Sequence, residues 1–317
     1  MPYPVGTIPS SAWCTLPEQS AVAALEAAAG AAYGANPLAQ VVAAPGTQAL
    51  IQWLPLVFPA RRVGILGFTY GEHEACWRAA GAEVTTVTTL ADLAGFDTGV
   101  VVNPNNPDGR TIAPDDLVAM AGILARRGGR LIVDESFTDV AGQSASVVPR
   151  FPAGGALILR SFGKAFGLAG LRLGFALAPA ADCLRLRRAI GPWAVSGPAI
   201  EIGRRALMDK AWLAETIVRL HHDAQRLDTL LRSAGFAVVG GTPLFRLGSH
   251  RQAAAIFQHL GRSGILARPF PENPAWLRFG IPGEPVAWSR LEAALRTIDL
   301  PSPAAAGSPG IPPTARP

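Results

Sequence analysis

Short apolar segments alternate with amphipathic segments through the first two thirds of the chain. The apolar segments predict strands at Val63–Leu66, Glu83–Val87, Gly99–Val102, Arg130–Val133, Ala156–Leu159 and Leu171–Leu177. Several segments between them have the pattern of helices, at Gly71–Ala80, Pro114–Arg127 and Ala180–Ala189. Strands that alternate with helices predict a mostly parallel sheet covered by helices on both faces. We therefore expect an α/β fold.

The pattern changes after about residue 195, where two long helical stretches precede shorter elements. The predicted strands are Ala237–Val239, Leu244–Leu247, Ile265–Ala267 and Trp276–Phe279, and the helices are Pro198–Met208, Ala211–Ser233, Gln252–Gly261 and Pro285–Thr297. This order predicts a smaller α+β domain. We expect four segments: 1–34 joining the small domain, 35–194 as the large domain, 195–300 as the small domain, and a disordered tail at 301–317 rich in Pro, Ala, Gly and Ser.

Composition and charge exclude several classes of protein. The net charge of +5 comes from arginines scattered along the chain, which is not the footprint of a nucleic-acid partner. The three cysteines form no CxxC pair, so we expect neither a disulfide framework nor a metal site. No apolar run has membrane-spanning length and no signal peptide is apparent, so we expect a cytoplasmic protein without a membrane partner.

Polar clusters follow two of the predicted strands, and a third precedes a helical stretch. Asn103–Gly109 is either a plain turn or the source of an amide that binds a ligand. Asp134 either caps a turn or awaits a cationic ligand. Gly46-Thr47 either caps a helix or binds a phosphate at the helix N-terminus. Ligands of parallel sheets bind at the carboxyl ends of strands, which favours a functional interpretation of the first two clusters.

Lysine is rare in this chain. Of the 28 basic residues only Lys164 and Lys210 are lysines. Lys164 lies in an apolar, glycine-rich stretch after a predicted strand, where desolvation lowers the pKa of an amine and makes it a nucleophile for carbonyls. The alternative is an ordinary surface lysine, which is how we interpret Lys210.

Together these clusters resemble a known superfamily. The motif NPNNPDG at 103–109 is similar to NPNNPTG, and SFGKAFGLAGLRLG at 161–174 is similar to S-x-x-K-x-x-x-x-x-G-x-R-x-G, both of the class I/II aminotransferases. The resemblance covers nearly the whole chain before the tail. It implies pyridoxal 5'-phosphate (PLP) as cofactor and the PLP-transferase fold type I, with a large domain around a mostly parallel sheet and a smaller α+β domain.

The resemblance also implies roles for individual residues toward the cofactor. Lys164 would bind PLP covalently and move protons, Asp134 would pair with the ring nitrogen, and Tyr70 would stack on the ring. Asn106 would bind the 3-oxygen of the ring and contact the substrate. The cofactor phosphate would be held by Gly46, Thr47, Ser161 and Arg172, with Gln48 as a weaker candidate.

Three further residues are implied to bind a partner or the substrate. Tyr33 resembles the tyrosine that reaches the cofactor phosphate of a neighbouring subunit, which implies a homodimer with shared active sites. Arg278 would hold the carboxylate of a phosphorylated amino acid. Arg268 is a candidate for the substrate phosphate, and its alternative is a solvated arginine before a proline turn.

Within the superfamily, several phrases are most similar to the threonine-phosphate decarboxylase family of cobalamin biosynthesis. These are PSSAWCTLP at 9–17, PGTQALIQWLP at 45–55, RSFGKAFGLAGLRLGFALA at 160–178 and GPWAVSGPAIEIGRRAL at 191–207. The resemblance implies decarboxylation of L-threonine O-3-phosphate. Two alternatives stay open: an aminotransferase for a substrate such as histidinol phosphate, and a non-catalytic relative that binds a ligand or partner.

The chain departs from the superfamily pattern in two places. Phe137 stands where many relatives have a tyrosine that donates a second hydrogen bond to the 3-oxygen of the ring. The chain begins at Met1-Pro2-Tyr3-Pro4, close to where the N-terminal arm of relatives would end, so either the start is truncated or misassigned, or that arm is missing.

Overall fold

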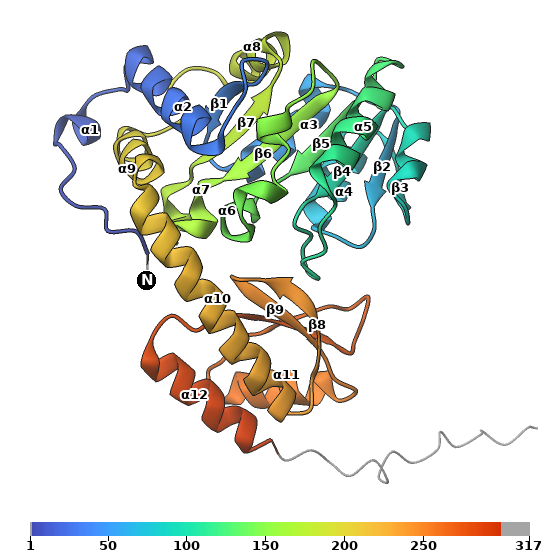
Figure 1. Cartoon of the computed structure of the whole chain (residues 1–317), viewed down its shortest axis with the longest axis vertical. Coiled ribbons are helices and arrows are strands. Elements are labelled where there is room, and N and C mark those ends of the chain that lie inside the picture. Colours follow the sequence, from blue (N-terminus) through green and yellow to red (C-terminus); the bar gives the residue numbers. More distant parts are fainter. Residues whose placement is uncertain (1, 299–317) are drawn as a thin grey trace, which may run out of the picture.

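A seven-stranded sheet forms the centre of the larger part of the chain in the computed structural model, which describes residues 2–298 (Figure 1). The strand order is β1-β7-β6-β5-β4-β2-β3. Strands β2 to β6 run parallel, and β7 runs antiparallel to both β6 and β1. The strands are β1 (Gln40–Ala44), β2 (Arg62–Leu66), β3 (Glu83–Val87), β4 (Thr98–Val102), β5 (Arg130–Asp134), β6 (Ala156–Ser161) and β7 (Gly174–Ala178). This confirms the expected α/β fold with a mostly parallel sheet.

Helices cover both faces of this sheet because its strands are apolar on both faces. In β5, Leu131 and Val133 join the core on one face, and Ile132 joins the core on the other. The first face packs against α2 (Gln19–Tyr33), α5 (Pro114–Ala125) and α9 (Gly197–Met208). The second packs against α3 (Thr47–Val57), α4 (Gly71–Ala79) and α8 (Ala180–Ile190). The alternation of strands and helices along the chain thus reflects one buried sheet.

A second, four-stranded antiparallel sheet lies at the other end of the molecule (Figure 1). Its order is β10-β11-β9-β8, with β8 (Ala237–Thr242), β9 (Phe245–Ser249), β10 (Arg268–Pro269) and β11 (Trp276–Gly280). Its helices are α10 (Lys210–Ser233), α11 (Ala253–Arg262) and α12 (Pro285–Arg296), which share a separate apolar core with it. The long helix α10 runs from the larger part of the molecule onto the smaller sheet.

The remaining elements are short and lie before β7 in the sequence. They are the helices α1 (Ser11–Cys14), α6 (Thr138–Ala141) and α7 (Phe162–Ala165), and the 3-10 turns η1 (Ala91–Gly95), η2 (Gln143–Ala145), η3 (Val148–Arg150) and η4 (Ala169–Leu171). No helix within residues 2–298 is long and apolar enough to cross a membrane.

Three strands differ from the expectation. The sequence pattern missed β1, a five-residue strand that completes the sheet edge by pairing with β7. Strand β7 begins at Gly174 and not at Leu171, because η4 and the positive φ of Arg172 (52°) interrupt the extended backbone. In the smaller sheet, β10 consists of Arg268–Pro269, beyond the predicted strand Ile265–Ala267.

The N-terminal helix α2 packs on β1 and α9, and its residues Leu25, Ala29 and Tyr33 are buried in the core of the larger sheet. Helix α9 lies within the predicted small domain 195–300, so residues of the segment 1–34 contact both that domain and the larger sheet. The domain boundaries stay predictions, and the predicted disordered tail at 301–317 lies outside the described residues.

The two parts of the molecule touch where the turn at 103–109 meets β8. A Cβ atom on Gly109 would lie 2.0 Å from the carbonyl oxygen of Gly241, and one on Gly240 would lie 2.2 Å from that of Asp108. Gly109 also has a φ of 73°, in the left-handed region that side chains disfavour. The turn therefore approaches β8 more closely than any residue with a side chain permits.

We predict that Gly109→Ala lowers the free energy of unfolding by about 2–4 kcal/mol, because backbone strain adds to a clash with β8. The matched control is Gly128→Ala, since Gly128 has a φ of 74° but no atom within 4 Å of a built Cβ. The control should lose only about 1 kcal/mol, the cost of the left-handed conformation. Urea unfolding measures both variants, and equal losses would contradict the close approach.

Candidate active site

A cavity of about 810 Å³ opens at the carboxyl edge of the larger sheet, and residues of the smaller sheet form its far wall. The sequence-predicted residues that line it are Gly46, Thr47, Gln48, Tyr70, Asn106, Asp134, Ser161, Lys164, Arg172, Arg268 and Arg278. Asn106, Asp134 and Lys164 lie at or just after the carboxyl ends of β4, β5 and β6, where ligands of parallel sheets bind. The structure thus brings together every predicted site residue except Tyr33.

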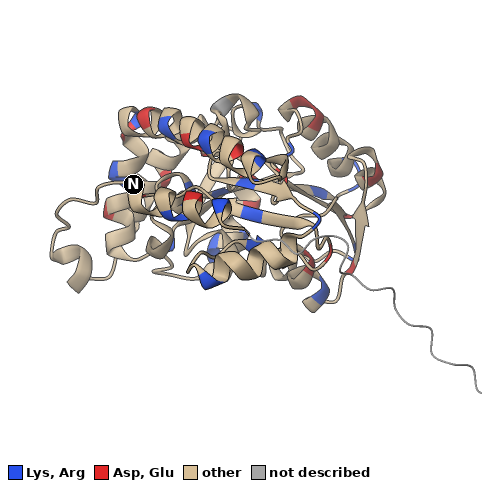
Figure 2. Cartoon of the chain, turned by 90° about the horizontal axis from the view of Figure 1, so that it is seen from below, with Lys and Arg blue, Asp and Glu red and all other residues tan. Residues whose placement is uncertain are grey.

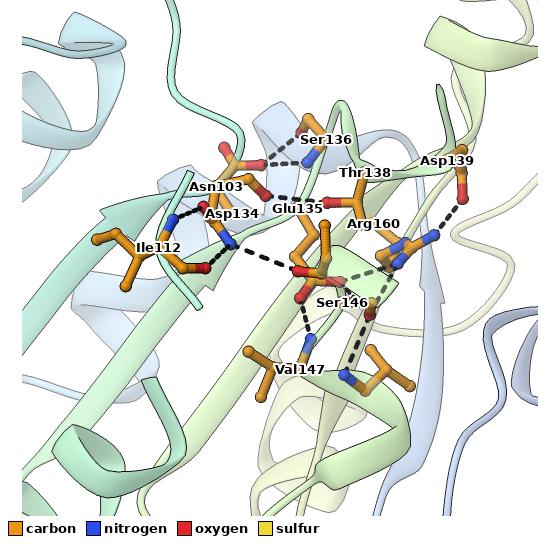
Figure 3. Close-up of polar contacts among 12 residues, drawn as sticks. Asn103, Ile112, Asp134, Glu135, Ser136, Thr138, Asp139, Ser146, Val147 and Arg160 are labelled. Atoms are coloured by element: carbon orange, nitrogen blue, oxygen red, sulfur yellow. Dashed lines mark hydrogen bonds and ion pairs between the residues drawn. The ribbon is translucent and has the colours of Figure 1, made fainter. Parts of the chain in front are cut away.

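Asp134 ends β5 and is only 3% exposed. His73 donates from Nε2 to Oδ2 over 3.0 Å. Ser136 donates from its backbone nitrogen to Oδ1 over 3.0 Å and from its hydroxyl to the same oxygen (Figure 3). Burial alone would raise the pKa of Asp134, but these donors outweigh it and hold the pKa below its usual value. The carboxylate is therefore kept ionised at the floor of the cavity.

Glu135 points away from the cavity into a buried ion network (Figure 3). Arg160, at the end of β6, donates to Glu135 over 2.8 Å and to Asp139, and Ser146 donates to Glu135 over 2.6 Å. Removing one partner from an ion pair this deeply buried would leave the other charge unpaired and would destabilise the fold. The network joins the residues beside Asp134 and Ser161, so it fixes the ends of β5 and β6 relative to each other.

The asparagines of the turn at 103–109 have different roles. Asn103 is buried and exchanges hydrogen bonds with the backbone of Ile112, 2.8 and 3.2 Å long. Asn105 is also buried and donates to the Phe68 carbonyl over 3.1 Å. Asn106 faces the cavity and accepts a hydrogen bond from Arg278. Two asparagines therefore shape the turn, and the third lines the cavity, where its binding of a ligand stays a prediction.

Lys164 lies in α7, immediately after β6, and is exposed to solvent through the cavity that it lines. The apolar side of α7 is buried, with Phe162 stacked on Phe166 at 4.4 Å. Partial desolvation lowers the pKa of Lys164, repulsion from Arg278 and Arg172 lowers it further, and attraction by Asp134 opposes this. A lowered pKa increases the fraction of free amine, which is the nucleophilic form.

The N-terminus of α3 forms an anion cradle with Arg172. Gly46 has a φ of 87°, and a Cβ atom there would lie 2.7 Å from Nη2 of Arg172. A Cβ atom on Gly174 would lie 2.6 Å from the backbone nitrogen of Thr47. Glycine at both positions thus keeps the guanidinium and the free N–H groups of the helix close together, beside the hydroxyl of Ser161. A phosphate group suits this donor set.

Two arginines approach from the smaller sheet. Arg268 in β10 and Arg278 in β11 are paired across adjacent antiparallel strands. Burial lowers the pKa of Arg278, and repulsion from Arg268 adds to this. Opposite them, the hydroxyl of Tyr70 donates to Oε1 of Gln48 over 3.1 Å, which holds the exposed ring at the cavity wall.

Tyr33 does not reach the cavity. It is 2% exposed, with its ring 4.2 Å from the guanidinium carbon of Arg160 and edge-on to Phe175. Its hydroxyl has no hydrogen-bond partner among the described residues, and burial raises its pKa. Tyr33 therefore lies in the core of its own chain and not at this cavity. Its expected contact with the cofactor phosphate of a neighbouring subunit stays a prediction.

The sequence patterns missed His73, Ser136 and Phe245 as site residues. Ser136 had a local signal, since a serine two residues after an aspartate can donate to it in a turn. His73 and Phe245 had none, because each meets the site only through folding: His73 is 61 positions from Asp134 in sequence. The described residues contain no group of three or more His, Cys, Asp or Glu side chains that could hold a metal ion.

Comparisons with known proteins agree with this geometry. The family model "Aminotransferase class I and II" matches residues 15–288. The chain is 43% identical to a threonine-phosphate decarboxylase of Pseudomonas aeruginosa, covering 93% of this chain and 88% of the relative. It is 40% identical to one of a Sinorhizobium species, covering 94% and 90%.

Solved structures share the fold. A histidinol-phosphate aminotransferase of Sinorhizobium meliloti in complex with PLP has a TM-score of 0.81 at 20% identity, covering 93% of this chain and 89% of that chain. An L-threonine-O-3-phosphate decarboxylase of Porphyromonas gingivalis has a TM-score of 0.76 at 20% identity, covering 91% of each chain. At these identities the likeness concerns the fold alone, and it confirms the PLP-transferase fold type I.

We predict that Ser136→Ala lowers the free energy of unfolding at pH 7 by about 1.5–3 kcal/mol, because a buried carboxylate loses its hydroxyl donor. The folded-state pKa of Asp134 lies below its unfolded value of about 3.9, so the stabilisation is present above that pH and is lost as the pH falls through the folded pKa. The difference between wild type and variant should shrink accordingly in acid.

Thermal or urea unfolding between pH 7 and pH 3 measures this difference. The control is Ser289→Ala, which removes an exposed hydroxyl bonded only to the Pro285 carbonyl and should cost less than about 0.5 kcal/mol. A loss in Ser136→Ala that does not change with pH would show that the hydroxyl does not act through the Asp134 carboxylate.

Proposed function

The chain belongs to the class I and II aminotransferase family, and on this premise we propose that it decarboxylates L-threonine O-3-phosphate with PLP as cofactor. The products would be CO2 and (R)-1-amino-2-propanol O-2-phosphate, a building block of cobalamin. Two relatives that cover most of the chain carry the name of this activity. The observation that supports it within the molecule is the charge of the cavity.

Four cationic side chains line the cavity, and Asp134 is its one carboxylate among the described lining residues. The cations are Lys164, Arg172, Arg268 and Arg278. Within residues 2–298, none of these three arginines has a carboxylate oxygen within 4.0 Å, whereas some of the outer arginines do, such as Arg226 beside Glu292 at 2.7 Å. Figure 2 shows basic and acidic residues intermixed along the outer helices. The cavity is thus suited to a ligand set with several negative charges, which a cofactor phosphate, a substrate phosphate and a carboxylate provide.

The residues present fit PLP. The cradle of Gly46, Thr47, Ser161 and Arg172 matches its phosphate, and the ionised Asp134 matches a protonated ring nitrogen. Tyr70 would stack on the ring, and Asn106 would donate to its 3-oxygen. When bound, PLP supplies an electron sink for the pair released as a bond to the substrate Cα breaks.

Four side chains of the cavity would bind and orient the ligands and transfer the protons. Lys164 would supply a free amine to bind the cofactor. Its Nζ would take up the proton that the substrate ammonium loses on binding and, after CO2 leaves, would give that proton to the substrate Cα. Asp134 holds the proton on the ring nitrogen. Arg278 orients the substrate carboxylate, and Arg268 binds the substrate phosphate. The bond held perpendicular to the ring plane is the one that breaks, so orientation by the two arginines decides the reaction.

We further propose a cytoplasmic homodimer. The three cysteines are free in the structure, which fits a reducing compartment. Exposed apolar side chains, among them Trp13, Leu56 and Trp193, offer surface that a second copy could cover. With Tyr33 buried, the family resemblance is the support for active sites shared between subunits.

The test is incubation of the purified protein with PLP and threonine phosphate, with and without 2-oxoglutarate. We expect CO2 release without a keto acid, and at least a tenfold lower kcat/KM for threonine, which lacks the phosphate that Arg268 would bind. Strict dependence on 2-oxoglutarate, with no CO2, would identify an aminotransferase instead. Equal rates for threonine and its phosphate would contradict the proposed phosphate recognition.

A further inference from the structure

Two phenylalanines from opposite sides of the cavity pack against each other. Phe137 follows β5 in the larger part of the chain, and Phe245 begins β9 in the smaller sheet. Their ring centroids are 5.1 Å apart at an interplanar angle of 80°, an edge-to-face contact. Both rings line the cavity, and neither is more than 9% exposed. The pair is therefore a contact between the two sheets inside the candidate active site.

Each ring also contacts one of the cationic side chains that line the cavity. Nζ of Lys164 lies 5.4 Å from the centroid of Phe137, and the guanidinium carbon of Arg278 lies 5.0 Å from the centroid of Phe245. Both distances are within the range of a cation–π attraction. The order Lys164, Phe137, Phe245, Arg278 thus forms a continuous row of contacts from α7 to β11.

The row separates two like charges that repel each other. Arg278 and Arg172 disfavour the protonated form of Lys164, and Asp134 favours it. Arg278 has Asn106 as its polar partner on the other side, and Arg268 repels it. Without the aromatic pair, nothing in this row would hold the guanidinium beside the amine.

We propose that Phe137 and Phe245 are positioning residues that fix the amine of Lys164 and the guanidinium of Arg278 relative to each other across the two sheets. Phe137 stands where relatives have a tyrosine whose hydroxyl donates a hydrogen bond. In this chain the ring itself positions the lysine, because its face contacts the amine and it packs edge-to-face with the second ring. The inference concerns the same cavity as the proposed reaction, but it rests on contacts within the protein and is testable without the substrate.

The lysine content of the chain makes a direct test feasible. Lys164 and Lys210 are the only lysines, so reductive methylation with ¹³C-formaldehyde gives two side-chain NMR signals beside that of the N-terminal amine. Lys210→Arg removes one signal and assigns the other to Lys164. The full chain without cofactor is titrated with base, and the midpoint of the Lys164 signal is compared between variants.

The two rings predict shifts of opposite sign. Phe137→Leu keeps an apolar neighbour but removes the cation–π attraction that favours the ammonium, so the pKa of Lys164 should fall by about half a unit. Phe245→Leu releases Arg278 and weakens its repulsion, so the pKa of Lys164 should rise by about half a unit. The Lys210 signal should respond to neither variant.

A coupling measurement tests the row as a whole. Arg278→Gln removes a repelling charge and should raise the pKa of Lys164 in the wild-type background. In the Phe245→Leu background the same substitution should have less than half of that effect, because the guanidinium is no longer held near the amine. Equal effects in both backgrounds would overturn the proposed role of Phe245.

Two control variants and one substitute for Phe137→Leu separate positioning from folding. Phe236→Leu removes a buried ring of the smaller sheet that contacts Phe279 and His250, and it should leave the Lys164 midpoint unchanged. Phe137→Tyr keeps the ring and should leave the midpoint within about 0.2 units of wild type, and Phe137→Met replaces Phe137→Leu if the latter fails to fold. A Lys164 midpoint that is unchanged or raised in the apolar Phe137 variant would overturn the proposal, whatever the outcome of the decarboxylase assay.

Discussion

Mutual repulsion among four cations around one cavity is the constraint on which the rest of the structure depends. Lys164, Arg172, Arg268 and Arg278 face a space in which Asp134 is the one carboxylate among the described lining residues. Such an arrangement costs stability in the absence of ligand and favours a ligand with several negative charges. The fold tolerates the cost because each cation is held by a separate element: α7, the residue after η4, β10 and β11.

The parallel sheet explains why the site lies where it does. Adjacent strands β4, β5 and β6 end at the same edge and deliver Asn106, Asp134 and Lys164 to one space. Beneath them, the buried network of Glu135 and Arg160 fixes the strand ends with charges that no water reaches. The three donors to Asp134 keep its carboxylate ionised before any ligand binds. The glycines around Arg172 likewise form the anion cradle in advance.

The sequence predicted those parts of the fold and site that depend on local patterns, and missed those that depend on contacts between residues far apart in the chain. NPNNPDG and the lysine motif are local patterns at strand ends, so the residues that they carry met in the structure as predicted. Strand β1 was missed because four small or apolar residues after Gln40 give little periodic signal, and its partner β7 lies more than a hundred residues away in sequence. His73 and the ring of Phe245 also meet the site only through contacts between residues far apart in sequence. The burial of Tyr33 could not be predicted, because a tyrosine in a helix has the same local pattern whether its hydroxyl points into the core or out of it.

The central claim is that Lys164 is the amine around which this site is built, and the second lysine of the chain makes its test direct. The protein is incubated with PLP, reduced with borohydride to fix the cofactor to its lysine, digested, and mapped by mass spectrometry. Our account predicts the added cofactor mass on the peptide that contains Lys164, at about one group per chain, and none on the peptide that contains Lys210. Modification of Lys210 instead, or of both lysines equally, would contradict it.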